Sequence, residues 1–394
     1  MQIEKRSRMT REKVVVIGAG IVGLAHAWSA AERGYDVTVF ERCSKASGAS
    51  IRNFGMVWPI GQPPGELFAA AMQSQARWRR LGEEAGIWVN PAGSIHLAHR
   101  ADEWAVLEEF AALPGVVSEK RGLRLLSADE VHRNTCAANP QGLLGGLYSP
   151  TELCVNPREA VHTIPKWLSE RYGVQFCFDT HIAGIESDRE AGTEIRITTS
   201  QGYSTSVHRA VLCCGAEIRS LFPSVLQRSG IVRCKLQMLS IETSETTWDR
   251  FPHLASGLTL RHYQNFDACS SIRNLRHRIA EETPELDHFG IHVMASQDNH
   301  GRIILGDSHE YGDDIEPFDR TLIDDLILRE LKKVLRLPNW NVTQRWHGIY
   351  AKHPSRPVVE LSPLPNVHIV TGTGGAGMTM SFGLAEQMWD RWLS

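Results

Sequence analysis

The chain has 394 residues, of which 42% are hydrophobic and 22% are charged, and its formal net charge is −3 at pH 7. This length accommodates two intimately joined domains, and the composition is that of a soluble globular protein. The slightly acidic balance argues against nucleic acid as the main partner, because nucleic-acid binding needs a basic surface. No apolar run reaches roughly 18 residues, so the sequence predicts no integral membrane span.

The first predicted element is a buried strand, which a glycine-rich turn and an apolar helix follow. Gly18, Gly20 and Gly23 have the G-x-G-x-x-G spacing, and a second predicted strand ends in Glu41. A strand–turn–helix–strand unit with an acid about 20 residues past the glycines is typical of a dinucleotide site. Gly18 permits the tight turn, Gly20 leaves room for a pyrophosphate, and Gly23 allows close packing of helix on strand. We expect phosphates at the helix N-terminus and ribose hydroxyls at Glu41.

Hydrophobic periodicity and turn residues predict the elements that follow. Helices are predicted over 66–85, 101–113, from 127, over 156–171 and 321–337, and after 377; strands are predicted over 88–97 (a pair bent at 91–93), 174–178, 193–199, 203–207, 210–215, 231–241, 290–295, 301–305 and 366–371. The strands between 231 and 320 have no helical crossovers, which indicates an antiparallel sheet in a separate layer.

The N-terminus and the cysteines bear on the compartment. The first 13 residues are polar and basic and no apolar signal core follows them, so a cytoplasmic location is expected. The eight cysteines include no C-x-x-C pair, which favours reduced thiols. His96 and His99 lie close together at helical spacing, and we identify no carboxylate partner for them. The sequence therefore predicts no metal site.

A second glycine cluster, Gly372–Gly377, lies between the last predicted strand and the last predicted helix. A helix N-terminus stabilises negative charge, and a reduced flavin gains negative charge at its pyrimidine ring. Two glycine-lined helix starts at opposite ends of one chain suit an elongated cofactor, with the pyrophosphate at one and the flavin ring at the other. A nicotinamide-dependent dehydrogenase needs only the first.

Several motifs, taken in order along the chain, carry a resemblance to a known family. They are Val14–Glu41, Gly48–Asn53, Asn156–Arg158, Ala210–Gly215, Ile303–Gly306, Trp346–Gly348 and Gly372–Gly377. Over residues 13–394 the chain resembles the D-amino-acid oxidase, glycine oxidase and monomeric sarcosine oxidase superfamily of FAD-dependent amine oxidoreductases. The resemblance implies a Rossmann-like α/β FAD-binding domain and an interleaved α+β substrate domain with an antiparallel sheet. The implied segments are 1–88, 152–225 and 338–394 for the first domain, and 89–151 and 226–337 for the second.

The resemblance also implies the residues that bind FAD. These are Gly18, Gly20, Ile21, Val22, Gly23, Glu41, Arg42, Ser50, Arg52, Asn53, Ile182, Cys214, Gly215, Gly374, Gly375, Gly377, Met378 and Thr379. Relatives that bind flavin covalently use a cysteine in the C-terminal part, or a histidine where Arg52 stands here. Because no cysteine follows Cys269, non-covalent FAD is expected.

Three places depart from the family pattern. Amino-acid oxidases of this group hold the substrate carboxylate with arginine, yet Tyr350 and Ser296–Asp298 stand at the two usual places. Sarcosine oxidases carry a lysine that helps oxygen react, and Ile304 stands there instead. The carboxylate clamp is therefore missing or rebuilt, and the electron acceptor stays open between O₂, a quinone and another protein.

A replacement anion clamp is predicted within Leu260–Phe266. The Arg261 guanidinium would hold an anionic group bidentately, with Lys235 adding a second positive charge. The alternative is that Arg261 pairs with a carboxylate of the protein. His347 and Tyr350 lie in the W-x-G segment, which faces the flavin in relatives. Lys352, His353 and Arg356 would form a positively charged rim of the site. The predicted substrate-orienting residues are Arg261, His262, Tyr263, His347 and Tyr350.

The Leu-Arg-His-Tyr stretch and the altered W-x-G segment are similar to a bacterial subgroup associated with aminophosphonate catabolism. We therefore expect FAD-dependent oxidation of the C–N bond of a small anionic amine, with 2-aminoethylphosphonate or its N-methyl derivative as candidates. No dedicated acid or base is assigned, because an amine that binds deprotonated needs none. Other readings are a D-amino-acid, glycine or sarcosine oxidase or dehydrogenase, a non-catalytic flavin-binding subunit, an NAD-linked dehydrogenase and an RNA-modifying enzyme. The oligomeric state stays open.

Overall fold

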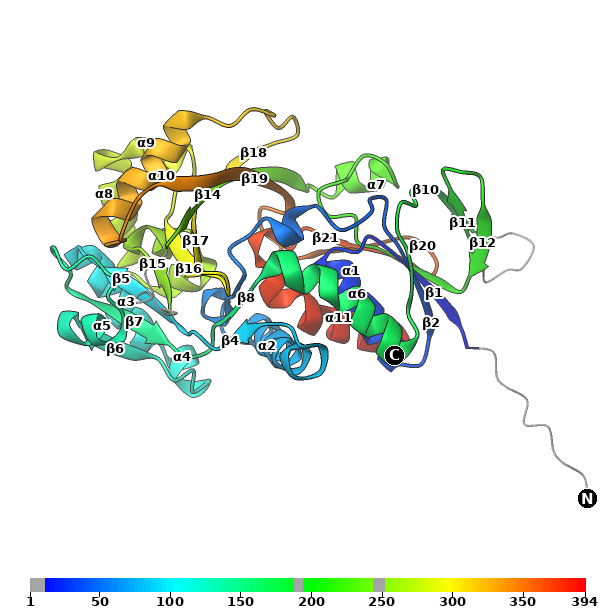
Figure 1. Ribbon diagram of the computed structural model, residues 1–394, viewed down its shortest axis with the longest axis horizontal. Coiled ribbons are helices and arrows are strands. Elements are labelled where there is room, and N and C mark those ends of the chain that lie inside the picture. Colours follow the sequence, from blue (N-terminus) through cyan, green and yellow to red (C-terminus); the bar gives the residue numbers. More distant parts are fainter. Residues whose placement is uncertain (1–10, 188–193, 244–251) are drawn as a thin grey trace, which may run out of the picture.

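The computed structural model describes residues 11–187, 194–243 and 252–394. Residues 1–10 of the polar N-terminal segment predicted over the first 13 residues lie outside the described residues, as does Thr193, the first residue of one predicted strand. A parallel sheet organises one side of the molecule and a mixed sheet organises the other (Figure 1, right and left). This arrangement confirms the predicted fold class.

The parallel sheet has the strand order β20-β21-β13-β1-β2-β9, in which the edge strand β20 alone runs antiparallel to its neighbour. Its strands are β1 (Lys13–Ile17), β2 (Asp36–Phe40), β9 (Gln175–Cys177), β13 (Arg209–Leu212), β20 (Val359–Leu364) and β21 (Val367–Thr371). Chain segments from both termini meet here, since β1 pairs with β13 and β13 pairs with β21. The first and the last predicted strands therefore end at the same edge.

Alternate residues of β1 face two different layers, as the two-residue period of a strand requires. Val14 and Val16 pack against helices, whereas Val15 and Ile17 pack against a small antiparallel sheet. The helices are α1 (Ile21–Glu32), α2 (Glu66–Ala85), α6 (Pro157–Tyr172) and α11 (Gly377–Leu393), and the small sheet consists of β10 (Ile182–Ser187), β11 (Ile195–Thr199) and β12 (Ser204–Val207), near which α7 (Pro223–Arg228) lies.

Local capping explains where several helices begin and end. The Asn156 side chain accepts a hydrogen bond from the Arg158 amide (3.1 Å) at the start of α6, and Gly173 ends that helix in the left-handed conformation. Ser127 forms a capping box with Glu130 at the start of the helix predicted from residue 127. Side-chain caps of this kind satisfy backbone groups that the helix leaves unpaired.

The mixed sheet has the order β18-β14-β17-β16-β15-β5-β7-β6, and β19 pairs with β14 off this path. Its strands are β5 (Ser94–Ala98), β6 (Arg124–Ser127), β7 (Gly145–Ser149), β14 (Val232–Glu242), β15 (His253–Ala255), β16 (Met294–Gln297), β17 (Arg302–Gly306), β18 (Glu310–Gly312) and β19 (Val342–Lys352). The pairing is antiparallel except between β15 and β5. Helices enclose a second hydrophobic core with it: α3 (Ala101–Ala112), α4 (Pro114–Ser118), α5 (Ala128–Asn134), α8 (Ile272–Glu282), α9 (Pro284–His288) and α10 (Thr321–Val334).

One prediction about the sheets is corrected. The strands predicted as a bent pair over 88–97 do not pair with each other: β4 (Val89–Asn90) joins β8 (Leu153–Val155) and β3 (Met56–Val57), whereas β5 joins the mixed sheet. The long strand β19 pairs with β14 from Val342 to Lys352. A long strand that belongs to the substrate-side sheet thus lies in a segment predicted for the other domain.

The eight cysteines are all free. Within the part of the chain that the structure describes, no helix is long and apolar enough to cross a bilayer.

Candidate functional site

A cavity of about 670 Å³ opens where the parallel strands end and continues to the mixed sheet. The residues at the carboxyl ends of β1, β2, β13 and β21 line it, as do residues of β14 and β19. Ligands of open α/β sheets bind outside the carboxyl ends of the strands, so the cavity has the position expected of a cofactor site.

The first glycine turn lines the cavity at the start of α1. A Cβ atom on Gly18 would lie 2.4 Å from the Cys213 carbonyl oxygen, and its φ of +106° favours glycine. A Cβ atom on Gly23 would lie 1.8 Å from the Gly18 carbonyl oxygen, so Gly23 serves packing and does not line the cavity. Gly20 lines the cavity, and there a Cβ atom would meet the Ser50 hydroxyl at 3.0 Å. The turn therefore forms a cradle into which a pyrophosphate fits, at the N-terminus of α1.

Glu41 lies at the end of β2 and lines the same part of the cavity. Its carboxylate accepts hydrogen bonds from the backbone amides of Ala19 (2.9 Å) and Cys43 (3.1 Å). These two bonds orient the carboxylate beside the glycine turn, which is where a dinucleotide ribose would lie. Its role as the ribose acceptor stays a prediction.

The neighbouring part of the cavity is lined by Arg42, Ile182, Cys214 and Gly215, all predicted cofactor residues. The Arg42 guanidinium pairs with Glu217 at 3.3 Å. Burial raises the pKa of the Cys214 thiol to about 12, so this cysteine is a neutral thiol at neutral pH. We expect the adenosine half of a dinucleotide here.

Arg52 and Asn53 lie where the cavity passes between the two sheets. The Asn53 side chain donates to the carbonyl oxygens of Ala49 (3.1 Å) and Ser50 (3.0 Å) and accepts from the Gly55 amide (2.8 Å). Asn53 therefore fixes the shape of the loop that carries Ser50. The Arg52 guanidinium donates to the His347 carbonyl oxygen (3.2 Å), which ties this loop to β19.

The second glycine cluster lines the cavity close to the start of α1, since a Cβ atom on Gly377 would lie 3.5 Å from the Ile21 side chain. Gly374, Gly375, Gly377, Met378 and Thr379 all line the cavity, and α11 begins at Gly377. The Thr379 hydroxyl accepts a hydrogen bond from the Trp58 amide (2.9 Å), which anchors this helix start to the chain beside it. The two helix starts therefore lie close together on the cavity, where both stabilise negative charge on a cofactor such as FAD.

The substrate-side wall contains three of the predicted orienting residues. His262, Tyr263 and Tyr350 line the cavity, and burial raises the pKa of both tyrosine hydroxyls above their ordinary value. The predicted rim residues Lys352, His353 and Arg356 line it as well. The Tyr263 and Tyr350 hydroxyls stay protonated at neutral pH and can donate hydrogen bonds. Together with the rim residues they make the wall rich in donor and cationic groups.

The predicted Arg261 clamp is corrected. The guanidinium donates to Asp287 (2.9 Å) and to the carbonyl oxygens of Leu258 (2.8 Å), Ile291 (2.9 Å) and Leu286 (3.3 Å). Arg261 is absent from the described residues that line the cavity. It is a structural residue, because its donors already have partners of the protein.

Lys235 and His347 are also directed elsewhere. The Lys235 ammonium pairs with Asp319 (2.9 Å) and donates to the carbonyl oxygens of Glu316 and Phe318. The His347 ring pairs with the same Asp319 carboxylate at 2.9 Å. Since side chains alternate along β14 and β19, these two lie on the face of the sheet away from the cavity.

Sequence reasoning missed three further residues of this wall. His292, His309 and Asp307 line the cavity beside His262, and all three are buried. Burial and neighbouring positive charge hold the pKa of the His262 and His292 rings well below the ordinary value, and the pKa of His309 falls to about 4. Burial raises the pKa of the Asp307 carboxyl. Their one sequence signal is that Asp307 and His309 stand two residues apart.

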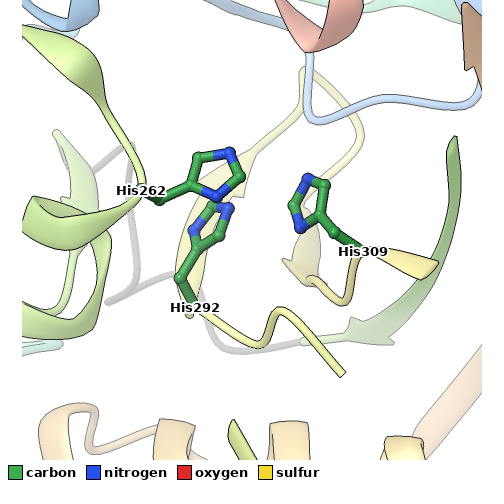
Figure 2. Close-up of side chains that lie close together, drawn as sticks. All are labelled: His262, His292 and His309. Carbon is green, nitrogen blue, oxygen red and sulfur yellow. The ribbon is translucent and has the colours of Figure 1, made fainter. Parts of the chain in front are cut away.

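The prediction of no metal site rested on spacing along the chain. The structure instead brings the rings of His262, His292 and His309 together from three distant segments (Figure 2). By contrast, His96 lies buried in the mixed-sheet half, where it packs against Trp58 and Phe266. The His99 ring forms a hydrogen bond with the Asn139 carbonyl oxygen at 3.0 Å.

Comparisons with known proteins agree with this geometry. The family model DAO, described as FAD dependent oxidoreductase, matches residues 13–391. A glycine oxidase of Bacillus licheniformis is 25% identical over 347 residues, which are 86% of this chain and 81% of the relative. The bifunctional tRNA 5-methylaminomethyl-2-thiouridine biosynthesis protein of Burkholderia orbicola is 33% identical over 157 residues, but these cover 37% of this chain and 24% of that protein. Glycine oxidase from Bacillus cereus has the same fold, with a TM-score of 0.74 and 18% identity over 97% of this chain and 94% of that one.

Proposed function

Because the chain belongs to the family of FAD dependent oxidoreductases, we propose that it oxidises the C–N bond of a small anionic amine. 2-Aminoethylphosphonate and its N-methyl derivative are the first candidates. The observation that carries this proposal is the cavity wall, where His262, Tyr263, Tyr350 and Lys352 gather hydrogen-bond donors and positive charge. A phosphonate has three oxygens and up to two negative charges, so a wall of several donors matches it better than a single bidentate group.

FAD supplies a two-electron acceptor for the hydride when it is bound in this cavity. Gly20 and the N-terminus of α1 would hold its pyrophosphate, and Glu41 would accept hydrogen bonds from the ribose. The N-terminus of α11, with Gly375 and Gly377, would stabilise negative charge at the pyrimidine end of the ring system. The cofactor set is the one predicted from the sequence, with Gly23 as a packing residue.

The reaction would break a C–H bond next to an uncharged amine, and bound FAD would supply the acceptor for the hydride and its two electrons. The resulting imine is hydrolysed by water to a carbonyl compound and ammonia or methylamine. The protein residues orient the substrate: Tyr263 and Tyr350 donate hydrogen bonds, and Lys352 offsets the anionic charge. The apolar neighbours Leu236 and Met238 exclude water from this part of the cavity.

Anaerobic mixing of the holoenzyme with a panel of amines tests the proposal. We expect 2-aminoethylphosphonate or its N-methyl derivative to bleach the visible absorption of the oxidised flavin, with glycine, D-alanine and sarcosine acting slowly. If glycine or D-alanine bleaches the flavin faster, the argument that the cationic, donor-rich wall selects a phosphonate is wrong. If no amine bleaches it, a non-catalytic flavin-binding subunit becomes the better description.

Amino-acid oxidation of the glycine or sarcosine type is the second candidate. The similarity to the glycine oxidase of Bacillus licheniformis over most of both chains favours it. The lack of arginine at Tyr350 and at Ser296–Asp298 argues against a carboxylate clamp of that type. The same panel separates the two candidates, because they predict different orders of the amines by rate of flavin bleaching.

A further inference from the structure

His262, His292 and His309 form a compact cluster at the cavity wall. His262 follows a turn of 3-10 helix at Gly257–Arg261, whereas His292 precedes β16 and His309 precedes β18. Their ring centroids lie 4.0 Å (His262 and His292), 4.4 Å (His262 and His309) and 5.0 Å (His292 and His309) apart. One ring nitrogen of each lies within 4.8 Å of the other two, and Figure 2 shows the three rings gathered in one space.

The hydrogen bonds of the cluster leave nitrogen atoms without partners. Neither ring nitrogen of the buried His292 has a hydrogen-bond partner among the described residues. The His309 ring is held by a hydrogen bond between Nδ1 and the Gly290 carbonyl oxygen (3.0 Å), which makes Nδ1 the protonated nitrogen and leaves the Nε2 lone pair free. A backbone carbonyl that binds the second nitrogen is the usual support of a metal-bound histidine.

A buried carboxylate completes the cluster. Asp307 Oδ1 lies 3.2 Å from His292 Nε2 without hydrogen-bond geometry, and Asp307 Oδ2 lies 3.8 Å from His309 Nε2. Burial of an ionised carboxylate beside neutral imidazoles is costly unless a cation compensates it. A cation between these side chains would satisfy both the carboxylate and the free ring nitrogens.

We propose that His262, His292 and His309, with Asp307 beside them, bind a divalent transition-metal ion, for which Zn²⁺ is the best fit. Imidazole nitrogen is a preferred ligand of Zn²⁺, and three histidines with an open position are known from catalytic zinc sites. Zinc–nitrogen bonds of about 2.0–2.1 Å place ligand atoms about 3.4 Å apart. Side-chain rotations that move each ring nitrogen by about 1 Å would therefore bring the three nitrogens to bonding distance of one ion.

The location of the cluster suggests what the metal does. His262 and Asp307 line the same cavity as Tyr263 and Tyr350, so an open coordination position faces the substrate space. The metal there takes an oxygen of the anionic group and replaces the arginine clamp that the chain lacks. This second part rests on the proposed function, whereas the metal site rests on the cluster alone.

Calorimetric titration of the holoenzyme with Zn²⁺ tests the site. The protein is prepared without a histidine tag, treated with a chelator and dialysed, and its FAD content reports folding. We expect about one Zn²⁺ per chain, with affinity reduced roughly tenfold or more in His262→Gln and in His292→Gln. His96→Gln is the matched control: this buried histidine of the same half lies outside the cluster, and its variant should bind Zn²⁺ as the wild type does.

Failure to bind Zn²⁺, or equal affinity in the cluster variants and the wild type, overturns the metal site. If the cluster variants lose FAD, X-ray absorption at the zinc edge of the loaded wild type decides the question: imidazole scattering supports the site, and its absence overturns it. Flavin bleaching with and without Zn²⁺ then separates the two parts. A rate that does not depend on Zn²⁺ overturns the anchoring role, whereas failure of every amine to bleach the flavin overturns the proposed function and leaves the metal site standing.

Discussion

The cofactor end and the substrate wall of the cavity are built in different ways. The cofactor end comes from two short segments, each a strand, a glycine turn and a helix start: β1 to α1, and β21 to α11. The substrate wall combines single residues from distant segments, such as His262, His292 and His309. Local motifs therefore determine how the cofactor is held, whereas tertiary packing determines what faces the substrate.

The largest expected effect is at the cofactor end. In Gly23→Ala the new Cβ atom would lie 1.8 Å from the Gly18 carbonyl oxygen, so α1 must move away from β1. We expect a loss of about 3 kcal/mol in the free energy of unfolding, together with loss of bound FAD. Urea unfolding and the flavin absorbance that remains after gel filtration measure the two effects.

Gly184→Ala is the control for this substitution, because its Cβ atom would meet only Thr198, at 3.9 Å. If Gly23→Ala retains FAD and stability like the control, the close packing of helix on strand does not hold the cofactor turn in place.

Arg261 tests the difference between the substrate wall and the protein core, because it is next to His262 of the wall in sequence but its guanidinium binds partners inside the protein. Arg261→Met removes a buried donor from three carbonyl oxygens and from Asp287. We expect a loss of about 3 kcal/mol in the free energy of unfolding, with little change in the KM of the folded enzyme. Arg276→Met on the exposed face of α8 should change stability by less than about 1 kcal/mol. A raised KM at unchanged stability would restore Arg261 as the anion clamp.

How far the sequence predicts the molecule follows from the same contrast. The strand, turn and helix around Gly18 and Gly20 were predicted because their pattern is contiguous. The pairing of β19 with β14 was not predicted, because it is a long-range contact that the residues of β19 alone do not encode. Arg261 was misread because the sequence cannot show that Asp287 and three carbonyl oxygens surround it. His292 and His309 were missed because no motif contains them.

A buried neutral histidine in each half of the molecule should make the protein less stable in acid. Burial lowers the pKa of His26 in α1 from its ordinary value of 6.5 to about 3, and His96 in β5 is shifted equally. Because each ring is neutral when folded but takes up a proton when unfolded, its contribution to stability is present above pH 6.5 and is lost as the pH falls toward 3. At pH 5 the loss from one ring is about 2 kcal/mol.

Urea unfolding between pH 7 and pH 5 measures this loss. The decrease in stability should be smaller in His26→Gln than in the wild type, whereas the exposed control His288→Gln should behave as the wild type does. If stability falls between pH 7 and pH 5 by the same amount in His26→Gln as in the wild type, His26 is not buried as a neutral ring.

The smallest expected effect concerns one hydroxyl of the substrate wall. Tyr263→Phe removes a donor that has the Met294 sulfur, at 3.5 Å, as its one hydrogen-bond partner among the described residues. Loss of a hydrogen bond to the substrate costs about 1 kcal/mol, which raises KM about fivefold. Steady-state kinetics with the best amine of the panel measure the change, and the exposed Tyr203→Phe should leave KM unaltered. An unaltered KM in Tyr263→Phe would show that the Tyr263 hydroxyl does not bind the substrate.

Flavin reduction by 2-aminoethylphosphonate and by glycine, compared in the wild type and in His292→Gln, tests the central claim most directly. We expect the ratio of the two anaerobic reduction rates at low substrate concentration to favour the phosphonate in the wild type and to fall in the variant. A ratio that favours glycine, or one that is the same in both proteins, would contradict the claim that this wall selects the substrate.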